Sequence, residues 1–344
     1  MESIYPRRIP MLGNLTGTGW TVASQESILS LIVVLGSSVS LVGLIFAFIT
    51  YSLFSDLRTM SGTALMYMLA NMFLTQLFYV VGVGGVQEDN LCLCLAFGIH
   101  YLRLAIISWL CVMTYDMLIT FRNNVNLNPR PEPVNVLISR FVQYSLFAWG
   151  MPSLSVIIAS IMRVMASHQV VDNLNPYNCW FFEKTIYNVT FVGPALCCFL
   201  IIMVTLIRSW LTIRATVGLQ VNKKSRLKMH KKRMLQLHLY VKIATLLFAI
   251  NVFGSAARNK SPDTDSIAWI AYNVGHSLQG ILVALAVTCN CQVLKIYTKS
   301  FAKKRWRRWT RNGSEVALFD KRDNDISDTT YLQNLTWEPV PLPV

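Results

Sequence analysis

Seven charge-poor apolar segments follow one another along the chain, with short polar stretches between them. Each is close to or longer than the ~20 residues that a helix needs to cross a bilayer. The pattern therefore predicts an all-α membrane protein, a bundle of seven transmembrane helices. The segments are Ile28 to Phe54, Thr63 to Gly85, Leu91 to Phe121, Phe141 to Met162, Ile186 to Ile207, Leu239 to Ala257, and Ser266 to Val293.

The third segment differs from the others because polar side chains recur along it at several depths. These are Cys92, His100, Arg103, Trp109, Asp116 and Arg122. An ionisable group that faces lipid costs at least a few kcal/mol. We therefore expect this helix to face protein on most sides and to stand at the centre of the bundle. The sixth segment also contains a cation, Lys242, which we expect to reach toward the membrane surface along its flexible stem.

Composition agrees with a membrane protein but leaves the positive charge to be explained. The 344 residues are 53% hydrophobic and only 14% charged, and the mean hydropathy is +0.44. The formal net charge is +14, yet the Lys and Arg residues gather in loops beside the apolar segments and do not cover a soluble face. We therefore expect contacts with anionic membrane lipids and an intracellular protein, and none with nucleic acid.

The basic loops also predict the orientation of the bundle. Arg58, the loops 122–140 and 208–233, and the tail from Lys295 hold 23 of the 31 Lys and Arg residues, whereas the N-terminal segment and the alternate loops hold six. Because cytoplasmic loops carry the excess of positive charge, the N-terminus is expected outside the plasma membrane and the C-terminus inside. Residues Met1 to Gln25 lack an apolar signal sequence, so the first helix is expected to act as its own signal.

Two features of the predicted outer side concern covalent chemistry. Asn14 stands in a glycosylation sequon on the short N-terminal segment 1–27. Cys92 opens the third helix and Cys179 precedes the fifth, so both are expected in an oxidising compartment, where they can form a disulfide bond. Cys94 is close enough to compete with Cys92, and the spacing favours neither.

Basic residues dominate the predicted inner side. The run before the sixth helix includes Lys223, Lys224, Arg226, Lys231 and Lys232. It can anchor the topology or dock an acidic cytosolic partner, and the sequence favours neither role. After the bundle, which we assign to residues 28–295, residues 296–311 are expected to form a basic amphipathic helix on the inner leaflet. Residues 312–344 are expected to be a disordered tail, in which Ser327, Thr329 and Thr330 beside acidic residues are candidate phosphorylation sites.

Motifs in several predicted helices resemble the secretin and adhesion branch of the G-protein-coupled receptors. The third helix carries Cys92, His100-Tyr101 and Ser108-Trp109 at the intervals of that branch. The other shared motifs are Trp149-Gly150-Met151-Pro152, Cys179-Trp180, and Gln279-Gly280 followed by Val283. Within the branch, the run from Trp109 to Met113, with Asp116 and Arg122, is most similar to the insect Methuselah-like receptors. Pro152 and the pair Gly193-Pro194 are each expected to kink a helix.

The chain also departs from that branch. Secretin receptors place a glutamate where this chain has Met113, and an asparagine where it has Ile202. The proline that bends their sixth helix has no counterpart between Leu239 and Ala257, so we expect either a milder bend at Gly254 or weaker coupling. Because 27 residues precede the first span in this sequence, we do not expect a tethered agonist of the kind that adhesion receptors carry.

The resemblance implies an agonist-gated receptor that signals to a heterotrimeric G protein and needs no cofactor. The residues expected to contact an outer ligand are His100, Arg103, Trp180, Asn251 and Gln279. An acidic group on the ligand would supply the counter-charge that Arg103 needs, although the residues slightly favour an internal, hydrogen-bonded structural role for Arg103. On the inner side, Arg58, Asp116 and Arg122 are expected to pair with one another or to meet the G protein.

Other classes of protein fit less well. A retinal protein needs a lysine in its seventh helix, odorant-gated channels keep their N-terminus inside, and transporters show repeated halves. The sequence shows no nucleophile paired with a base, no metal-ligand cluster and no phosphate loop, so we expect neither an enzyme nor a metal site. A seven-span adaptor that does not signal, or a truncated decoy form of such a receptor, remains the alternative.

Overall fold

The computed structural model describes seven stretches of the chain. They are residues 19–54, 60–83, 89–123, 134–167, 184–218, 223–259 and 267–289. Several predictions therefore lie outside the described residues: glycosylation at Asn14, the roles of Arg58, Cys179 and Trp180, and the assignments for residues 296–344.

The described residues are almost entirely helical. The elements are α1 (Gly19–Leu53), α2 (Met60–Val83), α3 (Asp89–Asn123), α4 (Val134–Ser167), α5 (Lys184–Tyr187), the π-helical turn η2 (Asn188–Val192), α6 (Gly193–Gly218), α7 (Lys223–Asn259) and α8 (Ile267–Thr288). Elements α5, η2 and α6 follow one another without a break and make up one span. Seven spans are long and apolar enough to cross a membrane, which confirms the predicted seven-helix bundle.

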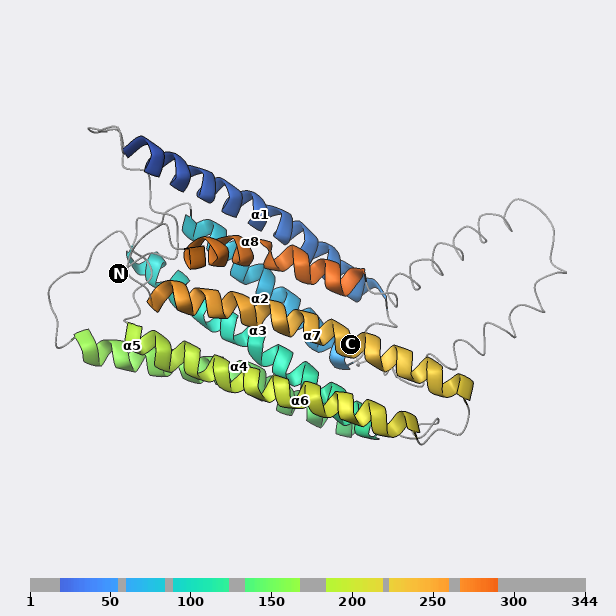
Figure 1. The fold of residues 1–344 in the computed structure, drawn as a ribbon. Helices are drawn as coiled ribbons and strands as arrows, with labels where there is room; N and C mark the ends of the chain where they lie inside the picture. The colour runs from blue at the N-terminus through green and yellow to red at the C-terminus, as the bar shows by residue number, and fades with distance from the viewer. Residues whose placement is uncertain are drawn as a thin grey trace, which may run out of the picture.

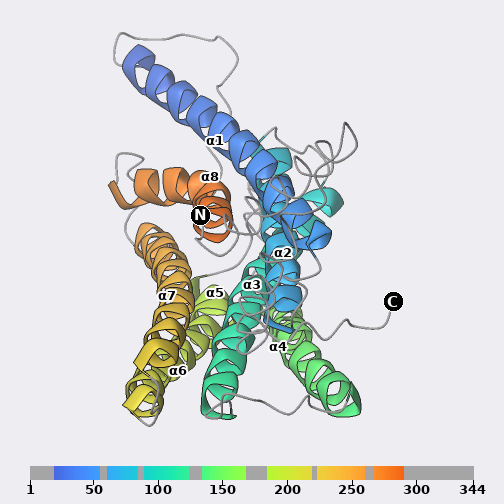
Figure 2. The same cartoon turned by 90° about the vertical axis from the view of Figure 1, so that its right-hand side faces the viewer.

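Helix α3 stands at the centre of the bundle (Figures 1 and 2), where it packs against α2, α4, α6 and α7. In the most apolar part of its span 78% of the residues are buried, against 22% for α4. The central position predicted from its polar residues is therefore confirmed. Helices α1 and α8 pack along each other on one side of the bundle, and α4 lies at the periphery.

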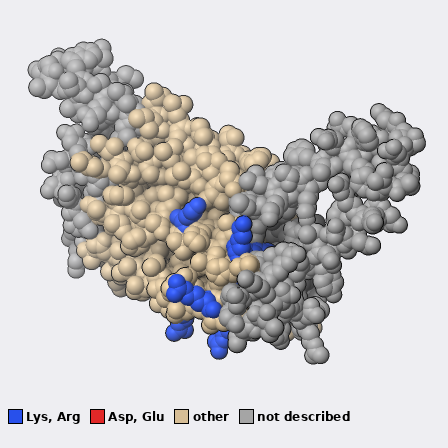
Figure 3. All heavy atoms as spheres, turned by 45° about the vertical axis from the view of Figure 1, so that its right-hand side comes forward, with Lys and Arg blue, Asp and Glu red and all other residues tan. Residues whose placement is uncertain are grey.

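The predicted loop between the fifth and sixth spans is mostly helical. Helix α6 continues to Gly218 and α7 begins at Lys223, so the basic run belongs to α7. The loop prediction was wrong because charge marks where a helix leaves the hydrocarbon, whereas Lys and Arg are good helix formers. We call the end of the bundle where α3 and α6 end and α7 begins the basic end. In the view of Figure 3, the described surface shows Lys and Arg side chains but no Asp or Glu.

The two expected proline kinks have different outcomes. Helix α4 is continuous through Pro152. The distortion at Gly193-Pro194 is present as η2, in which the N–H of Gly193 donates to the carbonyl oxygen of Asn188, five residues earlier. Helix α7 is continuous through Gly254, where a Cβ atom would lie only 2.8 Å from the Tyr272 ring. Gly254 thus lets α8 approach α7 closely.

Small residues bring α1 and α8 together. A Cβ atom on Gly280 would lie 2.8 Å from both Leu44 Cδ1 and Ser40 Cβ, so only glycine fits there without a shift. The hydroxyl of Ser40 donates to the carbonyl oxygen of Ser277 (2.6 Å) and accepts from the N–H of Ile281 (3.1 Å). These two backbone groups are four residues apart in α8. The Ser40 hydroxyl therefore lies between a carbonyl oxygen and an N–H that would otherwise bond each other within the helix.

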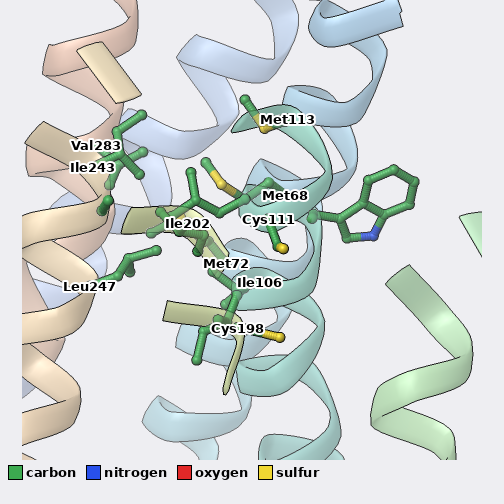
Figure 4. Close-up of a cluster of buried hydrophobic side chains, with 14 of the residues drawn as sticks. Met68, Met72, Ile106, Cys111, Met113, Cys198, Ile202, Ile243, Leu247 and Val283 are labelled. Atoms are coloured by element: carbon green, nitrogen blue, oxygen red, sulfur yellow. The ribbon is translucent and has the colours of Figure 1, made fainter. Parts of the chain in front are cut away.

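The middle of the bundle is apolar, including two positions where secretin receptors carry polar groups. Met113 and Ile202 are fully buried and belong to a cluster that joins five helices (Figure 4). The labelled members are Met68 and Met72 of α2, Ile106, Cys111 and Met113 of α3, Cys198 and Ile202 of α6, Ile243 and Leu247 of α7, and Val283 of α8. At Met113 and Ile202, dispersion contacts therefore replace the polar interactions of that branch.

Candidate functional site

Arg103 brings four elements together in the half of the bundle away from the basic end. Its side chain is 7% exposed, and its Nη2 donates to Oδ1 of Asn251 on α7 at 3.0 Å. The guanidinium carbon lies 4.6 Å from the ring centroid of Phe191 in η2 and 5.6 Å from that of Tyr272 in α8. Aromatic faces attract a cation, so these rings and the amide oxygen partly replace the water that burial removes.

No acidic side chain balances Arg103 within the described part of the chain. The one carboxylate among the described side chains is Asp116, which lies 13 residues further along α3, or ~20 Å away. A buried charge without a counter-charge is costly unless other groups compensate for it. A carboxylate or phosphate group from a ligand is the partner that a guanidinium binds best.

His100 takes part in a hydrogen-bonded chain that links α3, α4 and η2. Its Nε2 lies 3.1 Å from Ser155 Oγ, and the Ser155 hydroxyl donates to the carbonyl oxygen of Thr190. Since that hydroxyl has one proton, His100 Nε2–H is the donor to Ser155. Pro194 lacks the N–H that would normally reach the Thr190 carbonyl. His100, which is 1% exposed, therefore holds the Ser155 hydroxyl that bonds this carbonyl oxygen at the helix distortion.

A second polar cluster joins α2 to α8 beside Arg103. The Tyr79 hydroxyl donates to Oδ1 of Asn273, and Nε2 of Gln76 donates to the carbonyl oxygen of His276. The rings of Tyr79 and His276 lie 4.4 Å apart. The sequence indicates that Gln76, an amide in an apolar segment, needs a hydrogen-bond partner in the bundle. It does not distinguish Tyr79, Asn273 or His276, because each stands alone in its segment and only helix packing brings them together.

Gln279 lies deeper in the bundle than the groups around Arg103. It is buried on α8, about two turns beyond Tyr272, or ~10 Å along the helix. Of the five predicted ligand contacts, the structure brings Arg103 and Asn251 into direct contact. His100 joins them through Phe191, whose ring it meets edge to face at 5.4 Å.

Asp116 and Arg122 lie at the basic end but do not meet. Asp116 is buried and accepts a 2.7 Å hydrogen bond from Ser61 Oγ of α2, whereas Arg122 is exposed. Six residues separate them, which turns their side chains ~120° apart around α3. The structure therefore does not support their pairing, and Arg122 remains available to a partner. Side chains of Lys223, Lys224 and Arg226 lie outside the described set, while Lys231 is exposed and Lys232 half-buried.

Arg233 is a buried cation that the sequence analysis missed. It is 1% exposed, and its Nη1 donates to Oγ1 of Thr216 on α6 at 3.0 Å. Its guanidinium carbon lies 5.1 Å from the ring centroid of Phe121 on α3. Arg233 thus joins α3, α6 and α7 at the basic end. The basic run hid it, because charge alone does not show which of several cations turns inward.

The tryptophans shared with the secretin and adhesion branch pack against each other. Trp109 stacks on Tyr67 of α2, with ring centroids 4.9 Å apart, and meets Trp149 of α4 edge to face at 5.6 Å. These ring contacts join the central helix α3 to α2 and α4. Gly150 makes no close approach, since a Cβ atom there would find nothing within 4 Å. For the predicted disulfide, Cys94 is a free thiol, and the side chains of Cys92 and Cys179 are not among those described.

The comparisons with known proteins agree with this architecture. The family model described as "7 transmembrane receptor (Secretin family)" matches residues 26–283. Adhesion G protein-coupled receptor E2 of Macaca mulatta is 22% identical over 298 residues, which are 85% of this chain and 33% of the relative. Adhesion G protein-coupled receptor E3 of Homo sapiens is 28% identical over 142 residues, 41% of this chain and 21% of the relative.

A third relative is Cadherin EGF LAG seven-pass G-type receptor 1 of Homo sapiens, 28% identical over 160 residues, 46% of this chain and 5% of the relative. The chain thus spans about a third or less of the length of these relatives. Its seven spans and these relatives identify a multi-pass plasma-membrane protein. Because the family model covers well over half of the chain and the seven helices it requires are present, the chain belongs to the secretin family of seven-transmembrane receptors.

Proposed function

We propose that the protein is a receptor that passes an extracellular signal to a heterotrimeric G protein. Family membership supports a non-enzymatic receptor, and the first relatives carry that activity in their names. The proposed ligand site rests on Arg103, whose buried guanidinium contacts an amide oxygen and two aromatic rings. The excess of Lys and Arg in alternate loops supports an outer N-terminus and an inner basic end.

The ligand in this proposal carries an acidic group that binds Arg103. Such a group would compete with Asn251 for the guanidinium, and the bond from Arg103 to Asn251 joins α3 to α7. Losing that bond loosens α7, so the ligand favours an arrangement in which the inner ends of α6 and α7 part. The ligand can shift this equilibrium only by its difference in affinity between the two arrangements. Trp180 and Gln279 remain proposed contacts for the rest of the ligand.

The G protein in this proposal binds the basic end. Arg122 and Lys231 are exposed there, and positive charge speeds association with an acidic surface. Lys223, Lys224, Arg226 and Lys232 continue the same basic run. We also propose the remaining assignments made from the sequence: a Cys92–Cys179 disulfide, glycosylation at Asn14, and a tail at 312–344 that meets a receptor kinase and arrestin. Within the family, we place the chain nearest the Methuselah-like receptors, on the run from Trp109 to Arg122.

Basal signalling tests the G-protein side without knowledge of the ligand. The full chain is expressed in cells, and cAMP, calcium and G-protein dissociation are read against mock-transfected cells and an Arg122→Glu variant. We expect basal activity that Arg122→Glu abolishes, while Arg163→Glu, on α4 at the far end of the bundle, keeps it. Equal activity in the wild type and Arg122→Glu, at equal surface expression, would remove Arg122 from the coupling surface.

The ligand side has a separate test once an agonist is found. Arg103→Gln removes the charge but keeps a hydrogen-bond donor for Asn251, so the bundle should fold. We expect the potency of an acidic agonist to fall about tenfold to a hundredfold, the effect of losing a charge-assisted hydrogen bond. Unchanged potency with normal surface expression would show that Arg103 has a structural role alone.

The continuous course of α7 favours one alternative. The helix runs from Lys223 to Asn259 without a proline, so nothing in its backbone marks a hinge. A seven-span adaptor or decoy would need no such hinge. Silence in all three readouts with normal surface expression, and after the addition of candidate acidic peptides, would favour this alternative.

A further inference from the structure

Exposed cations and an aromatic ring line the outer faces of α6 and α7 near the basic end. We call Trp210 and Arg214 of α6, with Lys231 and His238 of α7, the α6/α7 basic patch. Arg214, Lys231 and His238 are exposed, and Trp210 is half-buried. Lys231 also belongs to the proposed G-protein surface, whereas Trp210, Arg214 and His238 have no role in the proposed function.

Two contacts between α6 and α7 fix the heights of the patch residues relative to one another. Arg233 bonds Thr216 near the basic end, and further along the helices Phe199 meets Phe248 edge to face at 5.3 Å. The helices are antiparallel, so these contacts set Trp210 at about the height of His238, with Arg214 about one turn nearer the basic end.

The residues also share the outward side of the seam between the helices. Trp210 and Arg214 are four residues apart, and Lys231 and His238 are seven apart, so each pair forms a stripe within ~40° around its helix. Both stripes are turned away from Thr216 and Arg233, which face the interior. The patch therefore spans α6 and α7 on the surface that faces lipid.

The Arg214 guanidinium is oriented so that it can bind an anion. Its guanidinium carbon lies 3.7 Å from the centroid of the Trp210 ring, so it stacks on the ring face. Stacking fixes the guanidinium while leaving its N–H edge open. No described residue accepts a hydrogen bond from this guanidinium, whose planar fork matches two oxygens of a phosphate.

The surroundings indicate where that phosphate comes from. Asp116, the one carboxylate among the described side chains, is buried and bonded to Ser61. Beside the patch, Ile207 and Leu211 of α6 are 52% and 53% exposed, and Val241 of α7 is 40% exposed. An apolar surface with a cationic edge fits a molecule that has both acyl chains and an anionic head.

We propose that the α6/α7 basic patch binds the head group of an anionic phospholipid in the leaflet around the basic end. Arg214 binds the phosphate through two N–H groups, Lys231 adds positive charge about one turn nearer the basic end, and Trp210 holds Arg214 in place. Lys242 lies one turn beyond His238 on the same stripe and is exposed, so its flexible stem reaches toward the same head group.

The test uses the full chain in nanodiscs of neutral phosphatidylcholine with increasing fractions of phosphatidylglycerol. Retained lipid is counted by native mass spectrometry. The double variant Arg214→Gln, Lys231→Gln should weaken phosphatidylglycerol retention about tenfold. Arg214→Lys keeps the charge but loses the fork, so we expect an intermediate loss. Arg208→Gln is the matched control, because Arg208 is an exposed arginine on α6 that points ~120° away from Arg214.

Five outcomes would overturn the proposal. Neutral lipid could be retained as well as phosphatidylglycerol. Arg208→Gln could lose as much retention as the double variant, so that net charge alone decides. Glycerol phosphate, which has no acyl chains, could compete at equal concentration, which would assign a free-anion site. An acidic peptide could bind in neutral nanodiscs with the same variant profile, which would assign a protein partner. If the double variant fails to insert into the nanodisc, the Arg214→Lys variant is the test. Full phosphatidylglycerol retention by Arg214→Lys would refute the proposed two-point bond from the Arg214 guanidinium to the phosphate.

Discussion

The contact between Arg233 and Thr216 is expected to hold the basic end closed. The perturbation that tests this is Thr216→Val, which keeps the shape of the side chain but removes the oxygen that accepts from Arg233 Nη1. Arg233 is 1% exposed and Thr216 is 6% exposed, so in the closed bundle water does not readily replace the lost partner. If α6 and α7 part, the guanidinium meets water and the substitution costs nothing.

The structure sets the size of the effect. A hydrogen bond from a charged group contributes about 1.5–3 kcal/mol, and the variant loses it in the closed arrangement alone. Each 1.4 kcal/mol is a factor of about ten in an equilibrium constant. The ratio of open to closed receptors should therefore rise about tenfold to a hundredfold. The Phe121 ring still stabilises the guanidinium in the variant. We therefore expect the rise in the ratio of open to closed receptors to be closer to tenfold than to a hundredfold.

Two measurements check this prediction. Basal G-protein dissociation should rise in Thr216→Val, and the unfolding temperature of the detergent-solubilised chain should fall. The matched control is Thr212→Val, one turn earlier on α6, because the Thr212 hydroxyl bonds only the carbonyl oxygen of Arg208 in its own helix. If both variants give the same basal signal and the same unfolding temperature, the contact does not hold the basic end closed.

Three further substitutions test the packing of the bundle by thermal unfolding in detergent. Gly280→Val places a Cβ atom 2.8 Å from Leu44 Cδ1 and should cost about 1–3 kcal/mol; an unchanged unfolding temperature would show that α1 yields freely. Ser155→Ala removes the hydroxyl that bonds both His100 and the buried carbonyl oxygen of Thr190 and should cost about 1–3 kcal/mol, with Ser153→Ala as its control. Trp109→Leu loses the stack on Tyr67 and leaves a cavity, so we expect a loss of at least ~2 kcal/mol; a loss below that would mean the interior collapses around leucine.

The sequence predicted most of the architecture because the membrane makes strong demands on single segments. A spanning helix must be apolar over ~20 residues, so seven segments could be counted before any contact was known. The charges within the third segment excluded a position in lipid and placed that helix at the centre. Small residues in the first segment, such as Gly36 and Gly43, permit close helix packing, and both lie against α8.

The sequence predicted the candidate sites only in part. It singled out Arg103 and Asn251, which meet although 148 residues separate them. It did not find Ser155, the partner of His100, because a lone serine in an apolar helix has no distinguishing pattern. It also assigned the basic run to a loop and so missed Arg233, which differs from its exposed neighbour Lys231 only in the face of α7 that it occupies.

The sequence by itself therefore determined the number of spans, the central helix and the receptor family, since each depends on local free energies of transfer or on local motifs. The tertiary structure decided which polar groups meet: Asp116 with Ser61 and not with Arg122, Arg233 with Thr216, and Arg214 with Trp210 at the lipid surface. Those pairings depend on how far each helix is rotated and shifted against its neighbours. Rotation and shift are set by the packing of the whole bundle, which no single segment specifies.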